Sequence, residues 1–239
     1  MQKLQPVTLG NRPAPVPQAG GALVHDSNKV LRNTYMLLAL TMLPTIGGAF
    51  VGMQMNLGLL FAAYPIGAPL VLFGLMIGSL FVVTAFRNSV FGIVALFGFT
   101  FIAGLALTPI LTHALRMSNG GQLIALAGGM TAVIFFSLAS FATVTKRDFS
   151  FMGKFLFIGL ILLIVASLAN LFFQVPALSV TISAIAVLLF SAYILYDVSR
   201  IVNGGETNYV MATMALFLNI YNLFISLLNI LLYFSGQRD

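Results

Sequence analysis

The chain of 239 residues contains no cysteine, only two histidines and only five acidic residues. The lack of cysteine excludes disulfide bonds and thiol chemistry, although it does not fix the cellular compartment. An intramembrane serine protease needs a histidine base in a span, yet His25 lies in the N-terminal tail and His113 falls in a loop. A paired-aspartate protease needs two carboxylates in the membrane, and only Asp197 lies in a hydrophobic run. We therefore expect neither an enzyme nor a metal site.

Charged residues are also scarce, at 7% of the chain, whereas 60% of the residues are hydrophobic and the mean hydropathy is +1.05. This composition excludes a soluble globular protein. A helix needs roughly 20 apolar residues to cross a bilayer, whereas strands of a barrel would alternate over segments of roughly 10 residues. The sequence therefore predicts an all-α integral membrane protein with a bundle of seven transmembrane helices. The predicted spans are Thr34 to Met53, Ile66 to Phe86, Val90 to Thr112, Gln122 to Val144, Phe155 to Phe173, Leu178 to Val198 and Tyr209 to Phe234.

The first thirty residues precede any hydrophobic run and contain the proline-rich stretch NRPAPVPQAGG. They lack an apolar core followed by a small-residue cleavage site, so we expect a flexible cytoplasmic tail from Met1 to Val30 and not a signal peptide. The gaps between the later runs are short. Residues 31–239 should therefore form one seven-helix membrane domain.

The basic residues sort by side of the membrane, and they explain the net charge of +6. With a cytoplasmic N-terminus, nine lie inside and two, Arg116 and Arg238, lie outside. The positive-inside rule then predicts a topology with the N-terminus inside and the C-terminus outside. No basic face with interleaved aromatic residues indicates nucleic acid as a partner. The nine are Lys3, Arg12, Lys29, Arg32, Arg87, Lys146, Arg147, Lys154 and Arg200.

A polar stripe runs along the last predicted span at intervals of three and four residues, which places its members on one helical face. Two compatible interpretations exist. Small residues allow helices to approach closely while amides bond across the bundle, or the stripe lines an ion or proton path. The opposite faces carry larger side chains suited to lipid or to packing. The stripe consists of Ala212, Ala215, Asn219, Asn222, Ser226 and Asn229.

Asp197 stands near the end of the otherwise apolar stretch LLFSAYILYDVSRI. In one interpretation it reaches water one turn from the cytoplasmic end and pairs with Arg200 three residues later. In the other it faces the bundle interior, as intramembrane carboxylates usually do, and marks a pathway or relay. If the helix continues through Ile201, the first interpretation weakens. The residues alone favour neither.

The segment AYILYDVSRI, followed by NGGETNYVMATMALFLNIYNLFISLLNIL, resembles the last two helices of the Bax inhibitor-1 (transmembrane Bax inhibitor motif) family. The stretch FGFTFIAGLALTPIL, Phe97 to Leu111, resembles the third helix of that family. The similarity covers about residues 30 to 235. It is strongest to the bacterial YccA type, in which GGETNY likewise follows the sixth helix.

This resemblance implies a seven-helix fold in which the last helix is central and the other six surround it. Calcium-leak members of the family have an aspartate matching Asp197 and pair it with a second aspartate in the last helix, which forms a pH-sensitive dyad. This sequence has Asn219 at the second position. Two close carboxylates raise the pKa of one of them, whereas an amide only forms a hydrogen bond. Arg87 matches a family arginine that pairs with the aspartate in the closed state, or it is a positive-inside anchor.

The YccA-type resemblance implies an interaction protein of the bacterial inner membrane that contacts lipids and modulates the membrane-anchored AAA protease FtsH. The tail from Met1 to Val30 is then the candidate partner-binding segment. The alternative is a pH-sensitive calcium or proton leak through the bundle, with Asp197, Asn219, Asn222 and Arg87 as candidate path residues. No cofactor is expected beyond transported or weakly bound calcium. The sequence leaves the oligomeric state open.

Overall fold

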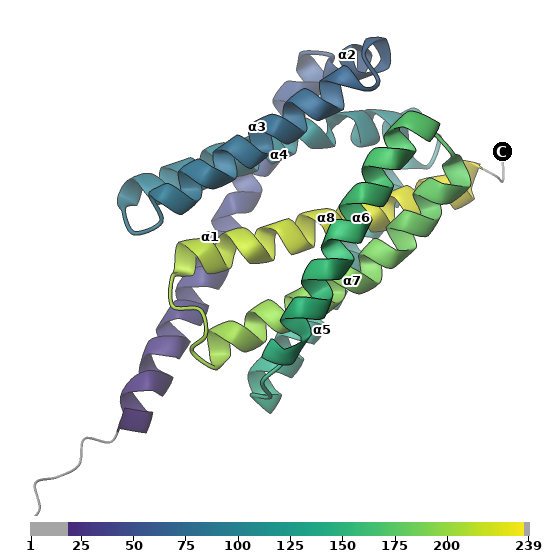
Figure 1. Cartoon of the computed structure of the whole chain (residues 1–239). Coiled ribbons are helices and arrows are strands. Elements are labelled where there is room, and N and C mark those ends of the chain that lie inside the picture. The colour runs from purple at the N-terminus through teal and green to yellow at the C-terminus, as the bar shows by residue number, and fades with distance from the viewer. Residues whose placement is uncertain (1–18, 237–239) are drawn as a thin grey trace, which may run out of the picture.

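A computed structural model describes residues 19–236, and this part of the chain is helical without any strand (Figure 1). Seven of its helices are long and apolar enough to cross a membrane, which confirms the predicted fold. A short helix α2 and a 3₁₀ turn η1, which the hydrophobic runs did not predict, join two pairs of spans. The elements are α1 (Ala19–Gln54), α2 (Leu57–Ala63), α3 (Gly67–Ala85), α4 (Val90–Leu115), α5 (Gly120–Thr145), η1 (Ser150–Met152), α6 (Gly153–Phe173), α7 (Pro176–Val202) and α8 (Tyr209–Gly236).

Several helices extend beyond the ends that hydrophobicity predicts, and the extensions of α1 and α4 change two of the expectations above. α1 begins at Ala19, so the predicted tail is already helical before Val30, while residues 1–18 lie outside the described part. Proline disrupts helices, and no proline stands between Pro17 and Pro44, so α1 can extend well before its predicted apolar run. α4 continues to Leu115, so His113 lies in its last turn and not in a loop. Hydropathy finds the part of a helix inside the membrane, not where its hydrogen bonding stops.

α8 is the most enclosed span. Half of the residues in its most apolar stretch are buried, against 6% for α3 and for α6. It packs closely on α1, α4, α5 and α7, whereas α3 packs mainly on α4 and α6 mainly on α7. The resemblance implied six surrounding helices, and the structure has four in close contact with α8. α3 and α6 instead form an outer layer that exposes many large apolar side chains.

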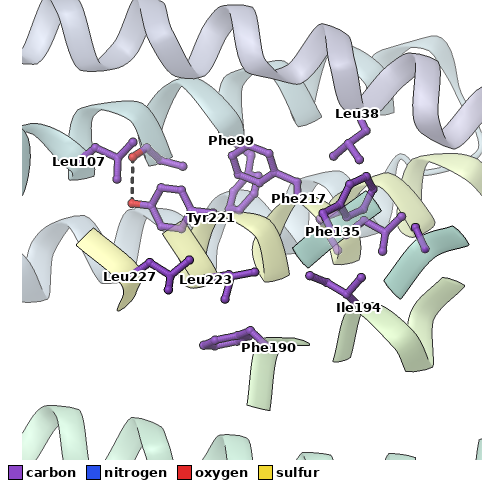
Figure 2. Packing of buried hydrophobic residues seen from close by; sticks show 14 of the residues in the cluster. Leu38, Phe99, Leu107, Phe135, Phe190, Ile194, Phe217, Tyr221, Leu223 and Leu227 are labelled. Carbon is purple, nitrogen blue, oxygen red and sulfur yellow. Dashed lines mark hydrogen bonds between the residues drawn. The ribbon is translucent and has the colours of Figure 1, made fainter. Parts of the chain in front are cut away.

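Aromatic side chains hold α8 against α4 at the centre of the bundle (Figure 2). The rings of Phe217 and Phe99 meet edge to face with centroids 5.8 Å apart, and the Phe217 ring stacks on Tyr221. The Tyr221 hydroxyl donates a hydrogen bond of 3.0 Å to the Ala103 carbonyl oxygen. A buried tyrosine needs such a partner because no water reaches it in a membrane. Both spans are thereby fixed in register.

α1 and α4 approach each other closely at two glycines. A Cβ atom on Gly48 would overlap the carbonyl oxygen of Phe101, and one on Gly104 would overlap the carbonyl oxygen of Thr45. Each helix therefore contributes one glycine to the crossing. In a bilayer such close contact replaces the hydrophobic effect as the main attraction between helices.

Hydrogen bonds gather several chain segments at one end of the bundle. The Ser199 hydroxyl donates to the Arg147 carbonyl oxygen (2.8 Å), and the Thr213 hydroxyl donates to the Thr34 carbonyl oxygen (3.3 Å). The Asn208 amide donates to the Arg87 carbonyl oxygen (3.1 Å). These contacts place the turns that carry Arg87, Arg147 and Arg200, together with the part of α1 around Thr34, at the same end.

The opposite end holds the last turn of α8, where Gly236 lies beside Met117 in the α4–α5 turn. Arg116 is in that turn. The described basic residues thus separate spatially as the charge count predicts. Which end faces the cytoplasm remains a prediction from the positive-inside rule.

Candidate functional site

The structure brings two predicted site residues together. Asn219 Nδ2 in α8 donates a hydrogen bond of 2.7 Å to Asp197 Oδ2 in α7. α7 continues to Val202, beyond Ile201, so Asp197 lies more than one turn inside the helix. A carboxylate removed from water needs donors, and a hydrogen bond to a charged oxygen is stronger than one between neutral groups. This geometry favours the interpretation in which Asp197 faces the bundle interior.

The alternative ion pair between Asp197 and Arg200 is wrong. Among the described side chains of residues 28–236, the salt bridge joins Arg200 Nη2 to Glu206 Oε2 at 3.8 Å. The guanidinium also donates to the Gly205 carbonyl oxygen (3.1 Å) and lies 5.6 Å from the centre of the Tyr196 ring. The spacing of residues along α7 could not reveal the partner of Arg200, because the carboxylate that reaches it comes from the following loop.

The loop GGETNY explains that contact. Gly204 has a φ of +76°, which favours glycine, and it turns the chain so that the N–H groups of Gly205 and Glu206 bond the Arg200 carbonyl oxygen (2.7 and 3.2 Å). This turn presents the Glu206 carboxylate to the guanidinium. Glu206 Oε1 also accepts a bond of 2.9 Å from the Asn208 N–H, so one side chain fixes both halves of the loop.

Asn208 then starts the last helix and fixes its position. Its Oδ1 accepts the N–H groups of Val210 and Met211, both at 3.0 Å, which is the geometry of a helix N-cap. Its Nδ2 donates to the Arg87 carbonyl oxygen and to Asn88 Oδ1 (2.8 Å). The beginning of α8 is thereby bonded to the α3–α4 turn. Sequence reasoning singled out this motif by resemblance but did not identify Asn208.

Arg87 enters this arrangement through its backbone. Its side chain is exposed and forms no salt bridge with Asp197 in the described part of the chain. The positive-inside interpretation fits this position. Pairing with Asp197 in another state of the protein remains a prediction.

A small cavity of about 20 Å³ lies beside Asp197, between α7, the loop and the first turns of α8. Asp197, Arg200, Glu206 and Ala215 are among its lining residues. This volume is enough for about one water molecule. The carboxylate therefore borders a polar space beneath the Arg200–Glu206 pair.

The rest of the polar stripe divides into two groups. Asn229 Nδ2 bonds across to α7, donating to the hydroxyl oxygens of Ser179 (2.9 Å) and Ser183 (2.7 Å). Asn222 and Ser226 instead bond carbonyl oxygens of their own helix, those of Leu218 (2.8 Å) and Asn222 (2.7 Å). The two serines were missed, although their spacing of four residues on α7 is a signal that could have found them. The stripe is thus largely a set of bonded groups, and two of its amides join α8 to α7.

Outside the spans, Asp148 accepts hydrogen bonds just before η1. Bonds from the hydroxyl and the backbone N–H of Ser150, the latter 2.8 Å long, lower the pKa of Asp148 below its ordinary value. The carboxylate is fully exposed, so its influence is confined to this turn. It is not part of the Asp197 site.

Comparison with known proteins agrees with this structure. The family described as "Inhibitor of apoptosis-promoting Bax1" matches residues 27–236. Protein PA2604 of Pseudomonas aeruginosa is 46% identical over 201 residues, which is 84% of this chain and 87% of the relative. "Modulator of FtsH protease YccA" of Escherichia coli K12 is 39% identical over 206 residues, 86% of this chain and 90% of the relative. "Inner membrane protein YccA" of Escherichia coli O6:H1 has the same identity and coverage.

These matches run through the whole membrane domain and are not confined to a short motif. The name of the last relative and the seven apolar helices confirm the predicted location, a multi-pass protein of the inner membrane. The family match includes both Asp197 and Asn219. The chain belongs to the Bax inhibitor-1 family.

Proposed function

We propose that this protein modulates a membrane-anchored AAA protease of the FtsH type and is not an enzyme itself. One observation carries the proposal: the relative named "Modulator of FtsH protease YccA" is 39% identical to this chain over 90% of its own length. Identity distributed over the whole bundle supports a shared role more strongly than a local motif would.

The geometry of the bundle is compatible with an interaction protein. Asp197 is bonded to Asn219, and Asn229 is bonded to Ser179 and Ser183. In these contacts the polar groups hold α7 and α8 together. A protein that acts by binding another membrane protein needs no conducting path through its centre.

The tail is the proposed point of engagement. A AAA protease extracts a membrane protein by gripping an unstructured segment, and we assign this role to residues 1–18, the part of the predicted tail that precedes α1. The hydrogen bonds that hold α8 to its neighbouring helices would resist extraction once the protease begins to pull. Slow degradation of this protein would then occupy the protease and reduce its activity on other substrates.

The test is a pulse-chase experiment in cells with and without the protease. Deleting Gln2 to Gln18 leaves α1 intact, because that helix begins at Ala19, and should slow protease-dependent turnover at least severalfold. A glycine- and serine-rich segment of equal length in place of the deleted residues is the matched control and should restore turnover. Unchanged turnover after the deletion would contradict the role of the tail. Failure of the protease to co-purify with the full chain would contradict the function itself.

A second function is proposed because Asp197 borders a small cavity and has a partner at the family's dyad position. In this proposal the bundle leaks calcium or protons slowly. Flux of calcium into liposomes that contain the purified protein would support it, and the protease proposal requires no flux. Asn219→Asp should add pH-sensitive flux by restoring two carboxylates that cannot both ionise cheaply.

A further inference from the structure

A large apolar cavity lies between α1 and α5. These two helices do not pack closely on each other, although both pack on α8. The space between them is about 900 Å³, and α8 forms its floor through Phe217 and Tyr221. Figure 2 shows Leu38 of α1 and Phe135 of α5 beside Phe217 at this place. The volume lies within the range of about 300–1,000 Å³ that is usual for ligand sites.

The lining of the cavity defines the chemistry of an occupant. Its lining residues in the described part of the chain are all uncharged, and most are apolar. At one end lies the Tyr35 hydroxyl, which is buried close to the Thr143 hydroxyl and forms no hydrogen bond of good geometry with the described side chains of residues 28–236. Thr143 and Ser140 of α5 line the cavity as well. A buried hydroxyl left without a partner is costly, so an occupant that supplies an acceptor oxygen would be favoured once the Tyr35 side chain turns its hydroxyl toward the cavity.

Basic residues lie just beyond this polar end. Arg32 precedes Tyr35 by three residues on α1, and Lys146 follows Thr143 by three residues at the end of α5. Three residues are about one helical turn, so both cations lie one turn beyond the two hydroxyls. Both side chains are exposed. This is the end of the bundle that gathers the basic turns and that the positive-inside rule assigns to the cytoplasm.

We propose that this cavity binds one acyl chain of an anionic phospholipid from the cytoplasmic leaflet. The chain occupies the space between α1 and α5, an ester carbonyl oxygen accepts a hydrogen bond from Tyr35, and the phosphate faces Arg32 and Lys146. Along the site the apolar lining comes first, then the Tyr35 hydroxyl, then the two cations Arg32 and Lys146. A phospholipid presents its acyl chain, its ester and its phosphate in the same order. Basic pockets between helices on the cytoplasmic side are known to suit anionic head groups. The inference does not depend on the protease proposal.

Two neighbouring glycines provide a matched test of the cavity. A Cβ atom on either Gly128 or Gly129 would meet no atom within 4 Å, but only Gly128 lines the cavity. The full chain would be purified, stripped of lipid and titrated with phosphatidylglycerol or phosphatidylcholine of identical chains, with bound lipid counted by native mass spectrometry. The native protein should bind one phosphatidylglycerol at least about tenfold more tightly than phosphatidylcholine. Gly128→Leu should reduce this affinity at least about tenfold, and Gly129→Leu should leave it unchanged.

Four further variants test the separate parts of the site. Tyr35→Phe should reduce the affinity for both lipids about fivefold, because the hydrogen bond to the ester is lost. Arg32→Gln with Lys146→Gln should abolish the preference for phosphatidylglycerol but leave the binding of phosphatidylcholine, while Arg116→Gln at the opposite end should change neither. Ala132→Phe, also in the cavity lining, replaces Gly128→Leu if that variant does not fold. Equal binding of the two lipids, or equal losses in the Gly128 and Gly129 variants, would overturn the proposal.

Discussion

The bond between Asn219 and Asp197 should contribute measurably to the stability of the bundle. Asn219→Ala removes the 2.7 Å donor and leaves the Asp197 carboxylate without the amide that faces it. Hydrogen bonds to charged groups contribute about 1.5–3 kcal/mol in soluble proteins. Between membrane helices the measured average is about 0.6 kcal/mol and the maximum about 1.7, because the unfolded chain in a membrane also finds partners. We therefore expect a coupling free energy of about 1–1.7 kcal/mol between the two side chains.

The appropriate assay is a double-mutant cycle that combines Asn219→Ala with Asp197→Ala, with the free energy of unfolding measured in bicelles. Asn222 supplies a matched control, because it lies on the same stripe but its amide bonds the Leu218 carbonyl oxygen within α8. Asn222→Ala should therefore show almost no coupling to Asp197. A coupling below about 0.3 kcal/mol for Asn219, or an equal value for Asn222, would refute the assignment of this bond as a tie between α7 and α8.

Four other outcomes are expected from separate parts of the molecule. Gly104→Leu should separate α1 from α4 and destabilise the bundle by about 1–3 kcal/mol in the same unfolding assay, whereas Gly98→Leu, where a Cβ meets nothing within 4 Å, should have little effect. Asn208→Ala should cost about 1–2 kcal/mol by removing the N-cap, and restored stability in Asn208→Asp would show that Oδ1 and not Nδ2 matters. A reporter fused after Asp239 should be periplasmic, and a cytoplasmic signal would contradict the predicted topology. Hydrogen bonds from Ser150 lower the pKa of Asp148, so the Ser150 amide should stay bonded to the carboxylate at and above the ordinary carboxyl pKa of 3.8. The bond should be lost only at lower pH, and an NMR titration that shows its release above 3.8 would contradict it.

Hydropathy predicted the fold because each span is a continuous apolar run that must satisfy its own backbone, so all seven were found to within a few residues apart from the long N-terminal extension of α1. The helical period also placed Asn219 and Asn229 on one face of α8. It could not say which partners that face meets, because Ser179 and Ser183 lie on another helix.

The predictions for Asp197 show that the spacing of residues along one helix does not identify partners on other segments. Spacing offered Arg200 as its partner, but the turn at Gly204 brings Glu206 to that guanidinium instead. The resemblance supplied Asn219 as the residue opposite Asp197, and the structure has them in contact. The cavity between α1 and α5 had no signal in the sequence, since it depends on how far two helices diverge across a third.

The central position of α8 has a consequence for biosynthesis. Ribosomes deliver a chain from its N-terminus, so the helix that occupies the middle of this bundle is the last to emerge. Until then Asp197, the Ser179 and Ser183 hydroxyls and the Ala103 carbonyl oxygen lack the partners that α8 provides. An interrupted chain would therefore present the Asp197 carboxylate within the bilayer without its amide donor, a feature by which quality control can distinguish it from the finished protein.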